Sequence, residues 1–148
     1  MSEGVFHRIL VATRGRPWSE RALELAVGMA AAYGIELVVV AVLTPGYEPE
    51  KHASWGIAPS ANVQEEIKAM AERTLDKARA LAAANGLTCI CAMRAGRAAD
   101  EILAAAHEHQ CDVIVIGSRG LSGVQRVTMG ETGNEVLLKA PVPVIVVK

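Results

Sequence analysis

Aromatic residues are scarce in this sequence, which has one Phe, two Tyr and two Trp among its 148 residues. Half of the residues are nevertheless hydrophobic (51%), and Ala, Val, Leu and Ile dominate. The interior must therefore be aliphatic, which suits close packing of helices on a sheet. A chain of this length fits one domain with a real core, and we place that domain at residues 1–148.

Cysteine and long apolar runs are scarce as well. Three cysteines are an odd and small number for a chain of this size, which argues against a disulfide framework. No run reaches the roughly 18 to 20 uncharged apolar residues of a membrane span, and the first residues lack the pattern of a secretion signal. We therefore expect a cytoplasmic protein.

Neither sign of charge dominates the chain. The net charge is −1, and Lys and Arg are mixed evenly with Asp and Glu. Because a basic tract is missing, the sequence argues against a general nucleic-acid-binding or membrane-binding surface.

Apolar runs that alternate with helical patterns divide the chain into elements. The expected strands are 8–13, 35–42, 87–93, 112–117 and 142–147, and the expected helices are 17–33, 63–85, 98–109 and 131–139. This alternation predicts right-handed βαβ crossovers and a single doubly wound, five-stranded parallel sheet with helices on both faces. Among doubly wound orders, 3-2-1-4-5 places a topological switch between strands 1 and 4, where ligands bind at the strand ends.

The helical patterns also predict which positions are buried. Expected inward positions are Leu23, Ala26, Val27 and Ala30 in the first helix, Val63, Ile67, Met70, Leu75, Ala78 and Leu81 in the second, and Ile102, Leu103 and Ala106 in the third. Gly34 and Gly86 are placed to end the first two helices.

A glycine-punctuated segment follows the apolar run at 113–116. Gly117, Gly120, Gly123 and Gly130 lie in it, and the helical pattern resumes at Glu131. Glycines let backbone N–H groups approach a ligand closely, and a helix N-terminus beyond them favours an anion. The segment therefore points to a phosphate site, although loops use glycine for other reasons too.

Residues 44–62 form a long segment without a helical or strand pattern, containing three prolines, two glycines and Trp55. A segment of this length in a compact domain is usually functional or mobile. Two interpretations stay open: a cover over a ligand, or a surface excursion with Trp55 tucked in.

Neither the pair of cysteines nor the cluster of histidines and cysteine is expected to have a catalytic or metal-binding role. Cys89 and Cys91 alternate along a strand and so face one side of the sheet, where small thiols are ordinary packing residues. His107 and His109 stand roughly 200° apart on a helix, so one face does not present both beside Cys111 as metal ligands. Neither a nucleophile elbow nor a Walker A motif is found.

The spacing of three glycines is more specific than their number. Gly117, two residues, Gly120, nine residues and Gly130 match the G-2x-G-9x-G pattern of the universal stress protein family. The segments RILVAT, WSERALELA, DVIVIGSRG and APVPVIVVK also resemble that family and fall where it has them. The chain thus resembles a universal stress protein over nearly its whole length.

The resemblance implies the 3-2-1-4-5 order of the adenine-nucleotide α-hydrolase-like fold and, in members with this glycine pattern, ATP binding. It implies phosphate and ribose contacts at Gly117, Arg119, Gly120 and Gly130, nucleoside contacts at Ala12 and Thr13, and backbone groups for adenine at Val42. Arg14, Glu131 and Thr132 complete the candidate binding set.

Two positions depart from the family pattern. Glu131 stands where the family has Ser or Thr, and Arg14 stands where the first strand commonly ends in Thr-Asp. A carboxylate at the first helical position occupies the partial positive charge that a phosphate would use, and it repels the phosphate. A guanidinium at Arg14 acts in the opposite direction, because it can bind a phosphate bidentately.

Our first hypothesis from the sequence is a homodimeric regulatory module that binds ATP, ADP or AMP, with or without Mg²⁺. No catalytic base is visible, so we expect ATP hydrolysis to be slow or absent. One alternative is a protein-interaction module whose pocket is self-filled and whose protein partner is unknown; a slow nucleotide hydrolase is another. We expect the dimer to form through the last strand, from Val142 to Val147. This strand leaves an apolar sheet edge, which the same strand of a second copy would cover.

Overall fold

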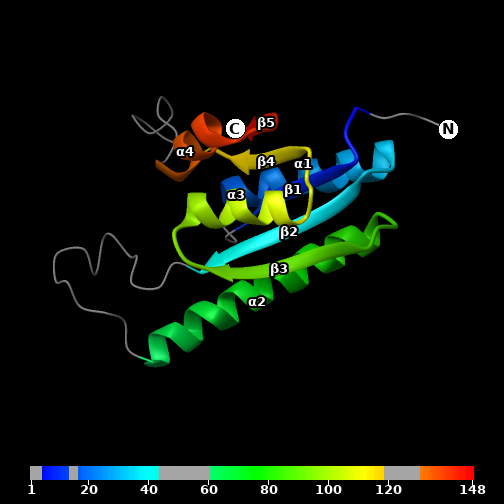
Figure 1. Ribbon diagram of the computed structural model, residues 1–148. Helices are drawn as coiled ribbons and strands as arrows, with labels where there is room; N and C mark the ends of the chain where they lie inside the picture. The colour runs from blue at the N-terminus through cyan, green and yellow to red at the C-terminus, as the bar shows by residue number, and fades with distance from the viewer. Residues whose placement is uncertain (1–4, 14–16, 44–60, 119–130) are drawn as a thin grey trace.

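The computed structural model describes residues 5–13, 17–43, 61–118 and 131–148. The elements are β1 (Arg8–Ala12), α1 (Pro17–Tyr33), β2 (Glu36–Leu43), α2 (Ala61–Ala84), β3 (Cys89–Ala95), α3 (Ala98–Glu108), β4 (Val113–Gly117), α4 (Glu131–Lys139) and β5 (Val144–Val147). Figure 1 shows the strands as one twisted sheet between helices.

The sheet order is β3-β2-β1-β4-β5, and all four neighbouring pairs are parallel. The predicted fold class and order are thereby confirmed. Strand bounds differ by one or two residues from those expected. β3 begins at Cys89 because its ladder with β2 starts with the pair Leu37–Cys89, and β5 begins after Pro143, which has no N–H to donate.

Two apolar layers cover the two faces of the sheet. Helices α1 and α2 pack on one face, over Ile9, Val11 and Val39, and helices α3 and α4 pack on the other, over Leu10 and Val38. These five strand side chains have no exposed surface. Because the central strands are buried on both faces, they show continuous apolar runs in place of strict alternation.

The predicted buried face of α1 is confirmed, since Leu23, Ala26, Val27 and Ala30 are all buried. In α3, Ile102 and Ala106 are buried and Leu103 is partly buried against the same layer.

One predicted inward position of α2 is wrong. Met70 is 55% exposed, whereas Leu75, Ala78 and Ala82 are buried. The inward stripe of α2 continues through Ala71, which packs against this layer. Met70 lies one residue before Ala71 and is therefore rotated about 100° away from the stripe.

The predicted helix ends at Gly34 and Gly86 are confirmed. Both glycines have positive φ, +68° and +76°. After Gly34 the N–H of Ile35 donates to the carbonyl of Ala30 at 3.1 Å, which turns the chain directly from α1 into β2. In the described segments, no helix combines the length and the hydropathy needed to cross a membrane.

Candidate site at the carboxyl rim of the sheet

The ends of β1 and β4 lie side by side at the carboxyl rim of the sheet. The parallel ladder between them ends with the pair Val11–Val115, and Thr13 and Gly117 each lie two residues beyond that pair along their own segment. Thr13 and Ser118 are polar residues that are nevertheless buried there, with exposed fractions of 2% and 8%. The candidate residues Thr13 and Gly117, from separate parts of the sequence, thus lie at the ends of neighbouring strands beside the topological switch.

Strand β2 extends beyond β1 at this rim. Val40 is the partner of Ala12, the last residue of β1, and residues 41–43 follow before β2 ends at Leu43. Ala12 and Val42 both pack against the layer formed with α3 and α4. Ala12, expected near the nucleoside together with Thr13, and Val42, expected at the adenine, therefore share one face of the sheet.

Helix α4 begins with Glu131, and Thr132 is half-buried in its first turn. The first-turn N–H groups have no partner within the helix, and this end of a helix carries partial positive charge. The structure thus places Ala12 at the end of β1 with Thr13 directly after it, Val42 on β2, Gly117 at the end of β4 and Thr132 in α4. Arg14, Arg119, Gly120, Gly130 and the side chain of Glu131 lie outside the described residues.

The turn between β3 and α3 is fastened to the end of β2. The N–H of Gly96 donates to the carbonyl of Leu43 at 2.8 Å. Gly96 has φ +145°, and a Cβ on it would lie 3.0 Å from Oε2 of Glu101, so a larger residue is strained and crowded there. The turn thus brings Arg97, which directly precedes α3, to this end of the fold.

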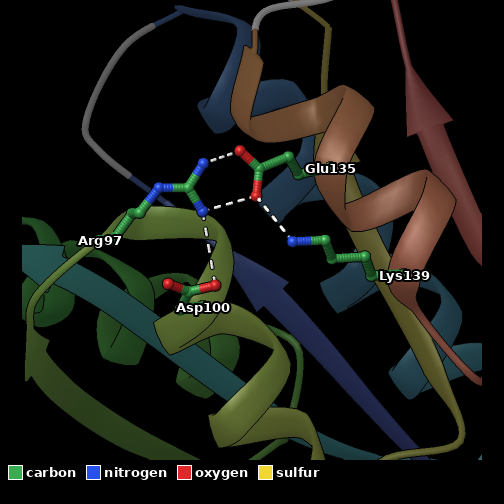
Figure 2. A network of polar contacts seen from close by, with 4 residues as sticks. All are labelled: Arg97, Asp100, Glu135 and Lys139. Carbon is green, nitrogen blue, oxygen red and sulfur yellow. Dashed lines mark hydrogen bonds and ion pairs between the residues drawn. The ribbon is translucent and has the colours of Figure 1, made fainter.

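Arg97 joins α3 to α4 through a four-residue ionic cluster (Figure 2). Its guanidinium binds both carboxylate oxygens of Glu135, with Nη1 at 2.5 Å from Oε2 and Nη2 paired with Oε1. Nζ of Lys139 lies 3.5 Å from Oε2 of Glu135, and Nη1 of Arg97 lies 3.4 Å from Oδ1 of Asp100. Figure 2 shows the guanidinium and the carboxylate face to face between the two helices.

A second arginine joins β3 to α3. Nε of Arg94 binds Oε1 of Glu101 at 2.9 Å, and Nη1 binds Oε2 of Glu108 at 2.6 Å. The hydrogen bond and the charge of Arg94 hold the pKa of the Glu108 carboxyl below its usual range. Arg94 pairs with Val42 across the ladder, so this network fixes α3 beside the end of β2.

The three cysteines lie away from the rim. Sγ of Cys89 and Sγ of Cys91 are 3.5 Å apart, and both residues pack against the α1–α2 layer, as the alternation predicts. Burial, with a smaller contribution from the hydrogen bond to Cys89, raises the pKa of the Cys91 thiol to about 11. Burial likewise raises the pKa of Cys111 to about 11. The thiols of Cys91 and Cys111 therefore stay protonated at neutral pH, which suits packing.

The described residues contain no group of three or more His, Cys, Asp and Glu side chains placed to hold a metal ion. A hollow of about 430 Å³ opens at the far end of α3, where His107, Cys111 and Val142 are among its lining residues. This hollow lies at the amino end of β4, opposite the candidate rim.

The sequence analysis missed Ser118, Arg97 and Glu135. The sequence position indicated the first two: Ser118 directly follows β4, and Arg97 directly follows the turn after β3. Both therefore belong to the rim at which the carboxyl ends of all parallel strands meet. Glu135 carried no such signal, because its position in a short helix does not tell which neighbour it faces.

The sheet order and the switch between β1 and β4 define a doubly wound domain with the adenine-nucleotide α-hydrolase-like fold. The model of the universal stress protein family matches residues 6–148. The chain therefore belongs to the universal stress protein family.

Two relatives match almost end to end. A universal stress protein of Thermus aquaticus is 34% identical over 148 residues, which cover 97% of this chain and 100% of that protein. The universal stress protein YxiE of Bacillus subtilis is 30% identical over 155 residues, which cover 97% of this chain and 100% of the relative.

Solved structures are similar over the same extent. The universal stress protein of Archaeoglobus fulgidus in complex with dAMP is 26% identical, with a TM-score of 0.69 and coverage of 98% of this chain and 100% of that chain. A universal stress protein in complex with cAMP is 25% identical, with a TM-score of 0.69 and coverage of 97% and 98%. UspA of Lactobacillus plantarum shares the fold at a TM-score of 0.80 and 21% identity, covering 99% and 100%.

Proposed function

We propose that this protein is a homodimeric regulatory module of the stress response that binds an adenine nucleotide at the carboxyl rim between β1 and β4. The observation that carries the proposal is the parallel pairing of β1 with β4, which leaves the buried polar residues Thr13 and Ser118 just beyond the carboxyl ends of the two strands. Universal stress proteins solved in complex with dAMP and with cAMP support the same ligand class.

The described residues divide the proposed site into two parts. Ala12 and Val42, on one face of β1 and β2, form the nucleoside side. Gly117 and the start of α4 at Thr132 form the phosphate side, where backbone N–H groups and the helix dipole favour an anion. The glycines Gly120 and Gly130 complete the phosphate side by their place in the family pattern.

The proposed ligand carries few phosphates. Glu131 opens α4 and brings a negative charge to the helix end that a phosphate would use. A monophosphate or diphosphate meets less of this repulsion than a triphosphate. Neither β1 nor β4 ends in Asp or Glu, and the residues that directly follow these strands are Thr13 and Ser118. Because no carboxylate stands at these two strand ends, Mg²⁺ would be held chiefly by the phosphates of the nucleotide.

The described rim also supports binding without fast turnover. Hydrolysis needs a side chain that takes a proton from water, usually a carboxylate or an imidazole within hydrogen-bond reach. At the described ends of β1 and β4 stand Ala12, Thr13, Gly117 and Ser118, and none of them supplies such a group. We therefore infer a sensor or carrier of the nucleotide, with ATP hydrolysis slow or absent.

The homodimer is proposed through β5. This strand is the edge of the sheet, and its residues from Val144 to Val147 are only half-buried in the single chain. Helix α4 adds Leu138, which is 85% exposed. Antiparallel pairing of β5 with its copy is self-complementary and would cover the apolar edge under two-fold symmetry.

Mass spectrometry of small molecules released from the purified, denatured protein tests the ligand class. We expect an adenine nucleotide, and titration calorimetry of the stripped protein should show binding of AMP and ADP but not of GMP. If no nucleotide is released and neither AMP, ADP nor ATP binds at millimolar concentration, the proposal is wrong. The interaction module with a self-filled pocket would then stand in its place.

A further inference from the structure

Helix α4 buries few apolar side chains against the rest of the fold. It has nine residues. Val136 is fully buried, but Leu137 is 42% exposed and Leu138 is 85% exposed. Among the described elements, α3 is the one that α4 contacts most. A short helix held by one buried side chain depends on further contacts to keep a fixed position.

The ionic fork between Arg97 and Glu135 is such a contact. The Glu135 side chain is 18% exposed, so the carboxylate is largely shielded from water. A planar guanidinium that binds both carboxylate oxygens fixes the direction as well as the distance between its partners. Glu135 is the fifth of the nine residues of α4, so the fork holds the middle of this short helix, three residues beyond Thr132.

The same fork is tied, at its other end, to β2. Arg97 follows Gly96, whose N–H binds the carbonyl of Leu43 at 2.8 Å. Leu43 is the neighbour of Val42 and ends β2. A continuous path therefore runs from the end of β2 through the β3–α3 turn to α4.

This path joins the two sides of the proposed nucleotide site. Val42 and Ala12 lie on the face of the sheet that α3 and α4 cover. The first turn of α4, with Thr132, lies on the phosphate side. The fork links Arg97, directly before α3, to Glu135 of α4, and so connects the two helices that cover this face (Figure 2).

We propose that Arg97 and Glu135 are positioning residues for the nucleotide: their fork fixes the start of α4 relative to β2 and so sets the distance between the phosphate and nucleoside sides. This inference rests on the proposed function. It predicts that breaking the fork weakens the binding of phosphate-bearing ligands and leaves the binding of adenosine unchanged.

A purely electrostatic role gives a different outcome. Removing the positive charge of Arg97 would weaken phosphate binding through Coulomb attraction alone, but removing the negative charge of Glu135 would strengthen it. If the fork positions α4, both Arg97→Gln and Glu135→Gln weaken AMP binding. The two explanations therefore differ in the sign of the Glu135→Gln effect.

The experiment is calorimetric titration of AMP, together with titration of adenosine followed by ligand-observed NMR. The proteins are the wild type, Arg97→Gln, Glu135→Gln and the double variant. We expect AMP affinity to fall about threefold to tenfold in each single variant. The double variant should lose no more than either single variant, because the same interaction is removed in all three. Adenosine affinity should stay within about twofold.

Two control variants match the chemistry without breaking the fork. Lys139→Gln removes a positive charge from the same cluster, where Lys139 makes one 3.5 Å contact to Glu135. Arg79→Gln removes an arginine from the exposed pair with Asp76 on α2. Both should leave AMP and adenosine affinity within about twofold of the wild type.

Hydrogen exchange of the α4 amides gives a readout that needs no ligand. Exchange at residues 132–136 should become faster in Arg97→Gln and Glu135→Gln and stay unchanged in Arg79→Gln. Unchanged exchange would show that the fork does not hold α4.

The outcomes separate the two proposals. If the wild type binds no adenine nucleotide, the proposed function is wrong and the positioning role falls with it. If the wild type binds AMP but Glu135→Gln binds it equally well or more tightly, only the positioning role is wrong. An equal loss of AMP and adenosine affinity would also overturn it, because general damage to the fold would explain the result.

Discussion

The carboxylate of Asp112 accepts a hydrogen bond from the backbone N–H of Arg8, at 3.1 Å from Oδ1, and so joins the start of β4 to the start of β1. Its second oxygen accepts a bond from the N–H of His7 at 2.8 Å, and the N–H of Asp112 donates to the carbonyl of Arg8 at 3.0 Å. The two central strands are thus fixed at their amino ends, opposite the proposed nucleotide site.

Replacing Asp112 by Ala should destabilise the fold without changing nucleotide binding. Hydrogen bonds to a charged group contribute about 1.5 to 3 kcal/mol each, and partial exposure of this site reduces that, so we expect a loss of about 1 to 3 kcal/mol in the free energy of unfolding. Urea denaturation measures it. Asp76→Ala on α2, where Asp76 is exposed, serves as control and should change stability by no more than about 0.5 kcal/mol. A weaker AMP affinity in Asp112→Ala would contradict the separation of the two ends.

Cys111 should make the folded state lose stability at alkaline pH. An unfolded thiol has a pKa of about 8.5, and burial raises the pKa of Cys111 in the folded state to about 11. Between these values the unfolded state binds fewer protons than the folded state, so the free energy of unfolding falls as pH rises. The contribution is fully present below about pH 8.5 and is lost by about pH 11.

Urea denaturation at pH 7.5, 9.5 and 10.5, values chosen from about 1 unit below the unfolded pKa upward, compares the wild type with Cys111→Ala. The wild type should lose more stability with pH than the variant, since the remaining titrating groups are common to both. Parallel curves would show that Cys111 ionises as easily in the folded protein as in the unfolded chain.

Replacing Glu131 by Ser should raise the affinity for ATP. Glu131 begins α4, and we predict that its charge disfavours a triphosphate at that helix end. We also propose that Glu131 and Arg14, which carry opposite charges at the same rim, form an ion pair when no nucleotide is bound; Arg14 and the side chain of Glu131 lie outside the described residues. Calorimetry of the wild type, Glu131→Ser, Arg14→Asp and the double variant tests the pair; Arg14→Asp alone should not raise ATP affinity. Wild-type ATP binding as tight as that of Glu131→Ser would mean that Glu131 points away from the phosphates.

Replacing Val146 by Pro should abolish the homodimer. The carbonyls of Pro143 and Val147 accept bonds from β4, from Ile114 at 3.0 Å and Ser118 at 2.8 Å. Successive residues of a strand point their backbone groups to opposite sides, so the N–H of Val146 faces the open edge. Proline removes this donor without removing a bond to β4.

Sedimentation velocity at micromolar concentration should show a wild-type dimer and a Val146→Pro monomer. Far-UV circular dichroism checks that the variant is folded. A wild-type monomer, or a folded Val146→Pro dimer, would exclude pairing through β5.

Much of the fold could be predicted because its signals are local. Strands such as β1 and β4 are buried on both faces and show as unbroken apolar runs, and Gly34 and Gly86 mark helix ends by their tolerance of positive φ. Met70 was misplaced because several stripes along a long helix fit an apolar pattern equally well. Only contact with the sheet decides that the stripe through Leu75 and Ala78 is the buried one.

The candidate site likewise contains residues that could be placed from the sequence and residues that could not. Thr13 and Gly117 could be placed from sequence because each ends a recognisable strand, and parallel strands end at one rim. Arg97 and Glu135 could not be paired, because 38 residues separate them and nothing local in either segment indicates the other.

The sequence by itself determined the strands, the helices, the family and the position of the glycine pattern, since all of these depend on residues close together along the chain. Only the tertiary structure decided which face α4 covers, which carboxylate Arg97 binds and how β2 is connected to α4. These are contacts between distant segments, and their geometry exists only after the helices have packed on the sheet.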